Sequence, residues 1–172
     1  MGLPPAPGGG KGVDHGYKGK GVLMHLLVDC KGQPLAITST SSKGNKRHQL
    51  TPLLEKAGVN CRLNNSYRRA MIIFEADRGY DADWLRADLL KVNIFPYIPR
   101  RKMGKESLNR PSNKAVREFF KIKPVRWVVE RTFSWLKRQY RRLILRWERL
   151  PSVWESFLTA GLILNWVRVL SR

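Results

Sequence analysis

Apolar residues recur at steps of three and four through residues 124–142, which predicts one amphipathic helix. Pro124 suits the first helical position, and no Gly or Pro follows before Pro151. The predicted apolar stripe consists of Val125, Val129, Phe133, Leu136, Tyr140 and Leu143. Arg126, Glu130 and Lys137 share a second line that borders this stripe. The pattern therefore places one acid between two bases at the edge of a buried face.

This line of charges has two interpretations. It could be a solvated helix face with an ion pair between Arg126 and Glu130, which would contribute a few tenths of a kcal/mol. It could also hold a metal-binding carboxylate whose cationic neighbours bind phosphates. A second carboxylate elsewhere in the chain is needed to decide between them.

The first third of the chain has the pattern of a β-hairpin and a helix. Apolar and β-branched runs predict strands at 22–28 and 35–40, with turn residues between them. A helix is predicted at 48–57, ended by Gly58. Residues 1–20 are rich in Gly, Pro and Lys, and we expect them to be irregular.

The middle of the chain alternates strand, helix and strand. Short apolar runs predict strands at 70–75 and 94–98, and a helix through Val92 is expected between them with Asp81 as its N-cap. Its predicted inward residues are Trp84, Leu85, Leu89 and Leu90. Such a βαβ unit predicts two parallel strands. The fold class is therefore α/β, with a mixed sheet and flanking helices.

The last predicted helix, residues 153–170, begins with Ser152 and Glu155 as a capping box. Its apolar run from Phe157 is interrupted by polar residues, so we expect a buried helix and no membrane partner. The N-terminus has no apolar segment of the kind found in signal peptides. Cys30 and Cys61 fit no metal spacing, which favours reduced thiols in a cytoplasmic protein.

Basic residues greatly outnumber acidic ones. The chain has 33 Lys and Arg against 13 Asp and Glu, a formal net charge of +20. Between residues 100 and 149 there are 17 basic and 4 acidic residues, so this segment carries most of the surplus. A surplus of this size indicates a polyanionic partner, most simply a nucleic acid.

Asp77 follows the predicted strand at 70–75, and Gly79 allows a sharp turn beside it. Ligands of open α/β sheets collect at the carboxyl ends of strands. Asp77 could merely cap the turn, or it could share a cation with Glu130 on the later helix. Mg²⁺ prefers such oxygen ligands, and two ions can activate a nucleophile and stabilise a leaving oxygen at a phosphodiester.

Two segments carry a family resemblance. Residues 75–81, with the sequence EADRGYD, resemble the second-aspartate motif of DDE insertion-sequence transposases. Residues 126–137, RWVVERTFSWLK, resemble the third-acid helix of the group with a Tyr-Arg-Glu-Lys signature. Arg126, Glu130 and Lys137 match that spacing, whereas Lys123 stands at the Tyr position.

The resemblance implies an RNase H-like fold and a DNA strand-transfer enzyme that uses two Mg²⁺ ions, with Mn²⁺ as a substitute. Asp77 and Glu130 would be the catalytic metal ligands, and Arg126 and Lys137 would bind phosphates. The implied partners are element ends and target DNA, bound by a homo-oligomer. Further candidates for DNA contacts are basic residues that could equally form a solvated face: Arg131, Arg138, Arg141 and Arg142.

The family's first aspartate is expected on a strand before the hairpin. Asp14 lies in a glycine-rich stretch and Asp29 in a predicted turn, so neither suits that role. We therefore expect residues 21–172 to form an incomplete catalytic domain that lacks its first strand, with doubtful activity on its own. The alternative function is a non-catalytic basic DNA-binding or assembly fragment of a transposase.

Overall fold

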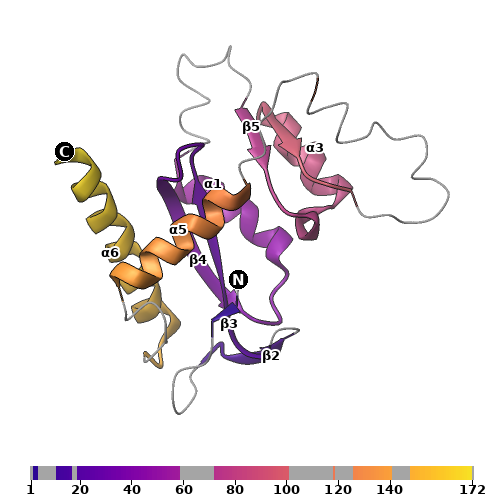
Figure 1. Ribbon diagram of the computed structural model, residues 1–172. Helices are drawn as coiled ribbons and strands as arrows, with labels where there is room; N and C mark the ends of the chain where they lie inside the picture. The colour runs from indigo at the N-terminus through magenta and orange to yellow at the C-terminus, as the bar shows by residue number, and fades with distance from the viewer. Residues whose placement is uncertain are drawn as a thin grey trace. The chain divides into compact units, whose positions relative to one another are not determined.

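The computed structural model describes residues 2–3, 11–16, 19–58, 72–100, 118, 126–140 and 148–171. These residues divide into two compact units (Figure 1). We call Met1–Ala57 with Val128–Arg172 the hairpin unit, and Gly58–Trp127 the βαβ unit. The elements are β1 (Gly2–Leu3), β2 (Asp14–Gly16), β3 (Gly19–Val28), β4 (Pro34–Ser41), η1 (Lys46–Gln49), α1 (Leu50–Lys56), β5 (Ile72–Glu75), η2 (Arg78–Tyr80), α3 (Asp83–Lys91), β6 (Ile94–Tyr97), α5 (Arg126–Gln139) and α6 (Pro151–Leu170).

The hairpin unit is built on β3 and β4, which confirms the predicted strand pair. They pair antiparallel from Val22↔Ser41 to Val28↔Pro34, with a bulge at Leu27/Val28. Strands β1 and β2 pair with the first half of β3, which itself begins at Gly19, so the prediction that residues 1–20 are irregular is wrong for the five residues of β1 and β2 and for Gly19 and Lys20. Backbone pairing with β3 depends little on side chains, which explains why a Gly-rich sequence can supply it.

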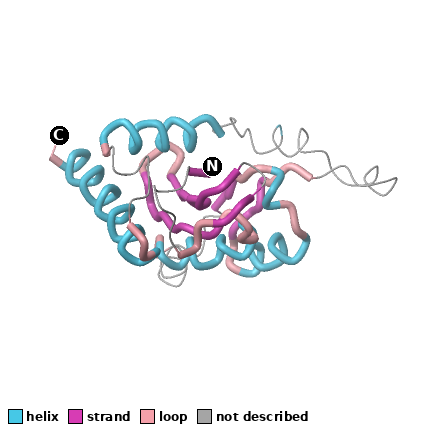
Figure 2. Tube along the Cα trace, turned by 90° about the horizontal axis from the view of Figure 1, so that it is seen from below, coloured by secondary structure: helices cyan, strands magenta, loops and turns pink. Residues whose placement is uncertain are grey.

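Helices α5 and α6 lie against β3 and β4 (Figure 1) and enclose the core of the hairpin unit. The buried cluster joins the sheet to both helices through Val22, Met24, Ile37, Phe133, Leu136, Trp154, Leu158 and Leu162. Figure 2 shows these helices flanking the strands. The predicted stripe of α5 is confirmed for Val129, Phe133, Leu136 and Tyr140, while Val125 and Leu143 lie outside the described residues.

Helix α6 differs from its prediction in two ways. It begins at Pro151 after Leu150, which makes no side-chain cap, so the predicted capping box is wrong. Glu155 instead accepts a 2.9 Å hydrogen bond from the Ser39 backbone N–H of β4. Only one face of α6 is buried, since Ile163, Leu164, Val167 and Leu170 are exposed. By length and composition alone α6 could cross a membrane, a test that core helices of soluble proteins also pass.

The βαβ unit has the predicted parallel strand pair. β5 and β6 are in register from Ile72↔Ile94 to Glu75↔Tyr97. α3 connects them and buries Leu85 and Leu89, but Trp84 and Leu90 are exposed, contrary to prediction. The two strands are only four residues long and cover one narrow line of α3. Leu85 and Leu89, four residues apart, lie on that line, whereas Trp84 and Leu90 lie to either side of it.

Candidate functional site

Asp77 lies two residues past the carboxyl end of β5, beside the parallel strand β6. Its backbone is extended, and its Oδ1 accepts a 2.6 Å hydrogen bond from the Gly79 N–H. The Tyr80 N–H donates to Asp77 O at 3.0 Å, which closes the 3₁₀ turn η2. The carboxylate is half-buried and held by its own turn, as the Gly at position 79 suggested.

Tyr80 reports the electrostatic environment of this turn. Burial raises the pKa of Tyr80 to about 12, and the negative charge of Asp77 adds to the shift. The phenol therefore stays protonated at neutral pH and remains a hydrogen-bond donor. A neutral donor near a carboxylate adds no further negative charge to the turn.

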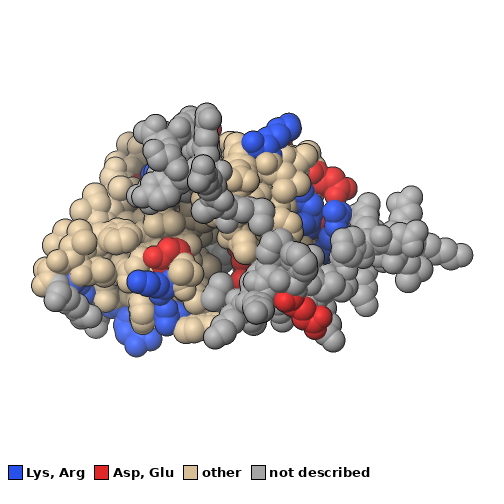
Figure 3. All heavy atoms as spheres, turned by 90° about the horizontal axis from the view of Figure 1, so that it is seen from above, with Lys and Arg blue, Asp and Glu red and all other residues tan. Residues whose placement is uncertain are grey.

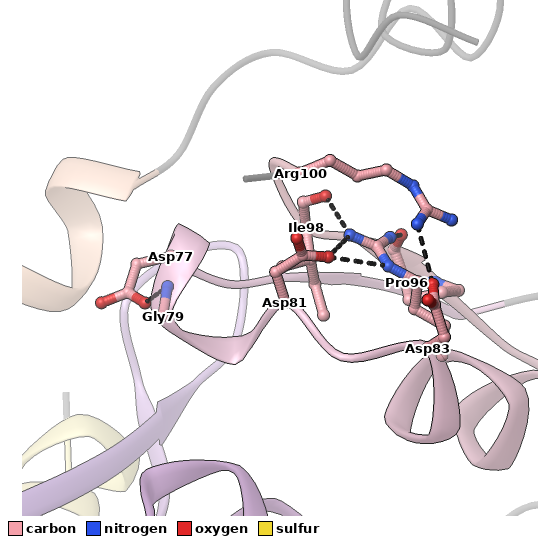
Figure 4. A network of polar contacts seen from close by, with 8 residues as sticks. Asp77, Gly79, Asp81, Asp83, Pro96, Ile98 and Arg100 are labelled. Atoms are coloured by element: carbon pink, nitrogen blue, oxygen red, sulfur yellow. Dashed lines mark hydrogen bonds and ion pairs between the residues drawn. The ribbon is translucent and has the colours of Figure 1, made fainter. Parts of the chain in front are cut away.

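Asp81 ends the turn, and its role differs from the prediction. The N-cap of α3 is Ala82, which makes no side-chain cap, so the predicted Asp81 cap is wrong. The Asp81 carboxylate pairs with Arg86 of α3 at 2.8 Å, with 14% and 12% of the two side chains exposed (Figure 4). The Asp81 carboxylate pairs with Arg86 rather than with the N–H groups of α3, because a buried charge needs an oppositely charged partner.

Arg86 is the residue of this region that sequence reasoning missed. It also donates to the Ile98 carbonyl at 2.7 Å and to the Pro96 carbonyl at 3.4 Å. The available signal was its position in α3 next to the buried Leu85, where a charged side chain needs a partner. Arg100 and Asp83 form a more exposed pair nearby, also at 2.8 Å (Figure 4).

Glu130 lies in the first half of α5, as predicted, and is exposed. Phe133, three residues further along the helix, is buried in the core, so Glu130 stands beside the face of α5 that packs in the hairpin unit. Arg126 is the first residue of the helix, and Lys137 is half-buried near its end. The three residues of the charged line therefore belong to one continuous helix.

The turn between β3 and β4 holds this helix in place. Thr132 Oγ1 donates to Gly32 O at 2.7 Å, and Arg131 Nη2 donates to Lys31 O at 2.8 Å. Gly32 has φ +90°, and a Cβ there would come within 2.8 Å of Val128 Cγ1. Asp29 Oδ1 accepts from two backbone N–H groups of the turn, so the expectation that Asp29 is a turn residue is confirmed.

The predicted DNA-contacting arginines have different surroundings. Arg138 is exposed, whereas Arg131 is half-buried, with its guanidinium 4.7 Å from the Trp135 ring centroid. Arg141 and Arg142 lie outside the described residues, as does most of the basic segment between 100 and 149. On the face that Figure 3 draws, the described Lys and Arg side chains stand at several separate places. Their contacts with DNA stay predictions.

The metal site also stays a prediction. Asp77 lies in the βαβ unit and Glu130 in the hairpin unit, so the structure does not test whether their carboxyl groups approach within roughly 8 Å. Both are oxygen donors of the type that Mg²⁺ prefers. Within the described ranges, no three His, Cys, Asp or Glu residues cluster closely enough to hold a metal ion. Asp14 is on β2, where Ser41 and Lys43 contact its carboxylate.

Comparisons with known proteins agree with the motifs. The transposase DDE domain family matches residues 3–166. A Burkholderia cepacia protein named "Putative transposase for insertion sequence element IS402" is 32% identical over 142 residues, 82% of this chain. The chain spans 60% of the length of that relative. No solved structure gives a significant match. With Asp77 after a parallel strand and Glu130 on the signature helix, the chain belongs to the DDE transposase family of insertion sequences.

Proposed function

We propose that the chain acts in DNA transposition by binding DNA and contributing to metal-dependent cleavage and joining of phosphodiesters. The observation that carries the proposal is Asp77, a half-buried carboxylate at the carboxyl end of a parallel strand, within the matched domain. Parallel strands place ligand-binding side chains at that edge. The RNase H-like arrangement and the homo-oligomer belong to the same proposal.

Asp77 and Glu130 would hold the metal, which when bound supplies charge stabilisation for the attacking and leaving oxygens. The residues of this chain would do the rest. Arg126 and Lys137 flank Glu130 on one helix and would bind phosphates of the scissile strand. The hydrogen bond from the Gly79 N–H to Asp77 Oδ1 fixes the orientation of the Asp77 carboxylate.

The test is cleavage and strand transfer on DNA that carries the element's own ends, with Mg²⁺ or Mn²⁺. Asp77→Ala and Glu130→Ala should abolish any activity, because each removes a metal ligand. Asp88→Ala is the matched control, since Asp88 is an exposed carboxylate of the same βαβ unit that pairs with Lys91. Activity that survives Asp77→Ala would contradict the proposed site.

The alternative is a non-catalytic DNA-binding or assembly fragment. It is supported by the formal net charge of +20, which indicates a nucleic-acid partner and requires no metal. On this alternative, Asp77 and Glu130 supply too few ligands to hold a pair of metal ions, and the chain alone would not join DNA ends. Salt-sensitive DNA binding without cleavage would support this alternative. Joining that depends on Asp77 would overturn it.

A further inference from the structure

One guanidinium connects the Asp77 turn to the end of the neighbouring strand. Arg86 reaches Asp81 Oδ1 with Nη2 at 2.8 Å and with Nε at 3.3 Å. The same Nη2 donates to Ile98 O at 2.7 Å, and Nη1 lies 3.4 Å from Pro96 O. Dashed lines in Figure 4 mark the contacts that Asp81 and Ile98 make with this guanidinium. The end of the turn and the end of β6 are therefore tied to α3 at one point.

The turn transmits this anchoring back to Asp77. The Asp81 N–H donates to Arg78 O at 3.2 Å, and the Tyr80 N–H donates to Asp77 O at 3.0 Å. On the other side, Ala76 N donates to Tyr97 O at 3.4 Å, which continues the β5–β6 ladder. Asp77 thus lies between two fixed points, β5 before it and Asp81 after it. Loss of either point would let the carboxylate rotate away with its turn.

Burial makes this pair different from the other ion pairs of the unit. Only 12% of Arg86 and 14% of Asp81 is exposed, against 74% and 51% for Lys91 and Asp88 on the same helix. A buried charge that loses its partner lowers the stability of the fold, so arrangements in which Arg86 and Asp81 separate are strongly disfavoured. Arginine suits it because its planar fork spreads its N–H donors toward a carboxylate and two backbone carbonyls, whereas the three donors of a lysine all lie on one nitrogen.

We propose that Arg86, acting through Asp81, is a positioning residue for Asp77. It sets the conformation of the 77–81 turn so that the Asp77 carboxylate is held ready for its ligand. This inference deepens the proposed function and rests on it for the identity of that ligand. The conformational part stands on the geometry of the turn.

Amide hydrogen exchange in the full chain tests the conformational part. Arg86→Lys keeps a charge for Asp81 but cannot make all the contacts to Asp81 and the two carbonyls. The Asp81→Asn/Arg86→Met double variant removes both charges, so neither is left buried without a partner and the variant is expected to stay folded. We expect the Gly79 and Tyr80 amides to exchange at least about tenfold faster in both, with Leu89 of α3 changed less than about twofold. Lys91→Met is the control and should change neither. Equal exchange of Gly79 in wild type and double variant would overturn the inference.

Mn²⁺ binding tests the functional part, measured at a temperature where each variant is fully folded. Arg86→Lys should weaken the Asp77-dependent binding of Mn²⁺ by at least about tenfold, while Lys91→Met leaves it unchanged. A folded Arg86→Lys protein with wild-type Mn²⁺ affinity would show a merely structural role and overturn the inference. If Asp77→Ala itself leaves Mn²⁺ binding unaltered, the proposed metal role of Asp77 fails, and the exchange rates still decide whether Arg86 sets the turn.

Discussion

The two candidate acids are held by different physical means. Asp77 stands in a turn fixed by a buried ion pair and by backbone hydrogen bonds, over a strand pair of four residues each. Glu130 stands on a helix of 14 residues that packs with apolar side chains against a hairpin and against α6. Apolar packing tolerates small shifts, whereas a buried charge pair is bound to one geometry. We therefore expect the first site to be sensitive to single polar changes and the second to changes of volume.

The largest effect should come from Trp154→Ala in α6. Trp154 has no exposed surface and belongs to the core of the hairpin unit. Loss of a buried Trp costs about 4 kcal/mol of unfolding free energy through lost burial and a cavity. Hydrogen exchange should show lost protection in β3 and β4 but retained protection in β5 and β6. Equal loss in both units would show that the two do not unfold separately.

Gly32→Ala should break the contact between the hairpin turn and α5. Its φ of +90° costs about 1 kcal/mol for an L-residue, and the new Cβ would meet Val128 at 2.8 Å, which adds about 2 kcal/mol of overpacking. Gly58→Ala is the matched control, because φ is +67° there and nothing lies within 4 Å. Urea unfolding should give about 3 and about 1 kcal/mol for the two variants. Equal values would mean that the helix yields to the added methyl group.

The hairpin unit should lose stability in acid through His25. Burial lowers the pKa of His25 from 6.5 to about 4, and Lys46 adds to the effect. Between pH 6.5 and pH 4 the imidazole of His25 is protonated in the unfolded chain and neutral in the folded chain. The free energy of unfolding therefore falls as the pH drops from 6.5 to 4, by at most about 3 kcal/mol.

The measurement is urea unfolding as a function of pH, with His25→Phe as the comparison. The variant keeps an aromatic ring, loses the 2.8 Å hydrogen bond of His25 Nε2 with Thr40 Oγ1, and has no group to titrate, so its stability should fall less over the same range of pH. His48→Gln is the control, because His48 is exposed. An unchanged slope in His25→Phe would assign the acid sensitivity to other groups.

The smallest effect should come from Glu155→Gln, which tests whether a charged side chain also contributes to the stability of the hairpin unit. Glu155 accepts from the Ser39 N–H at 2.9 Å and from its hydroxyl at 3.3 Å. A neutral amide oxygen keeps the first bond but weakens it, so we expect a loss of about 1 kcal/mol. Urea unfolding checks the value. A loss as large as that of Trp154→Ala would show that α6 depends on this carboxylate rather than on its apolar face.

Periodicity predicted the strands and helices well because it depends on near neighbours in sequence. The β3–β4 pair, the parallel β5–β6 pair and the stripe of α5 were all expected. Two of the errors involve polar side chains that have two possible partners. Asp81 and Glu155 both stand where helix caps are common, but each finds a stronger partner on another element. The local sequence identifies a hydrogen-bond donor or acceptor, but it does not show which group distant in sequence will bind to it.

The same limit applies to the candidate site. Asp77 and Glu130 were found because their motifs are contiguous in sequence. Arg86 was missed because its purpose depends on the carbonyls of Pro96 and Ile98, whose nearness only the folded βαβ unit reveals. The pairing of β1 and β2 with β3 was missed for a similar reason, since backbone groups leave no side-chain pattern.

The division of the hairpin unit into two separate stretches has a consequence for folding during synthesis. Its sheet is made within the first 57 residues, yet the bonds that hold α5 and α6 to it span 100 to 132 positions in the sequence. While the chain is being translated, β3 and β4 are made well before α5 and α6, which complete their packing, whereas the βαβ unit needs only neighbours close in sequence. The exposed hairpin is thus the stretch of a nascent chain most open to chaperones or to wrong partners, and the Asp77 turn is set before the Glu130 helix has its support.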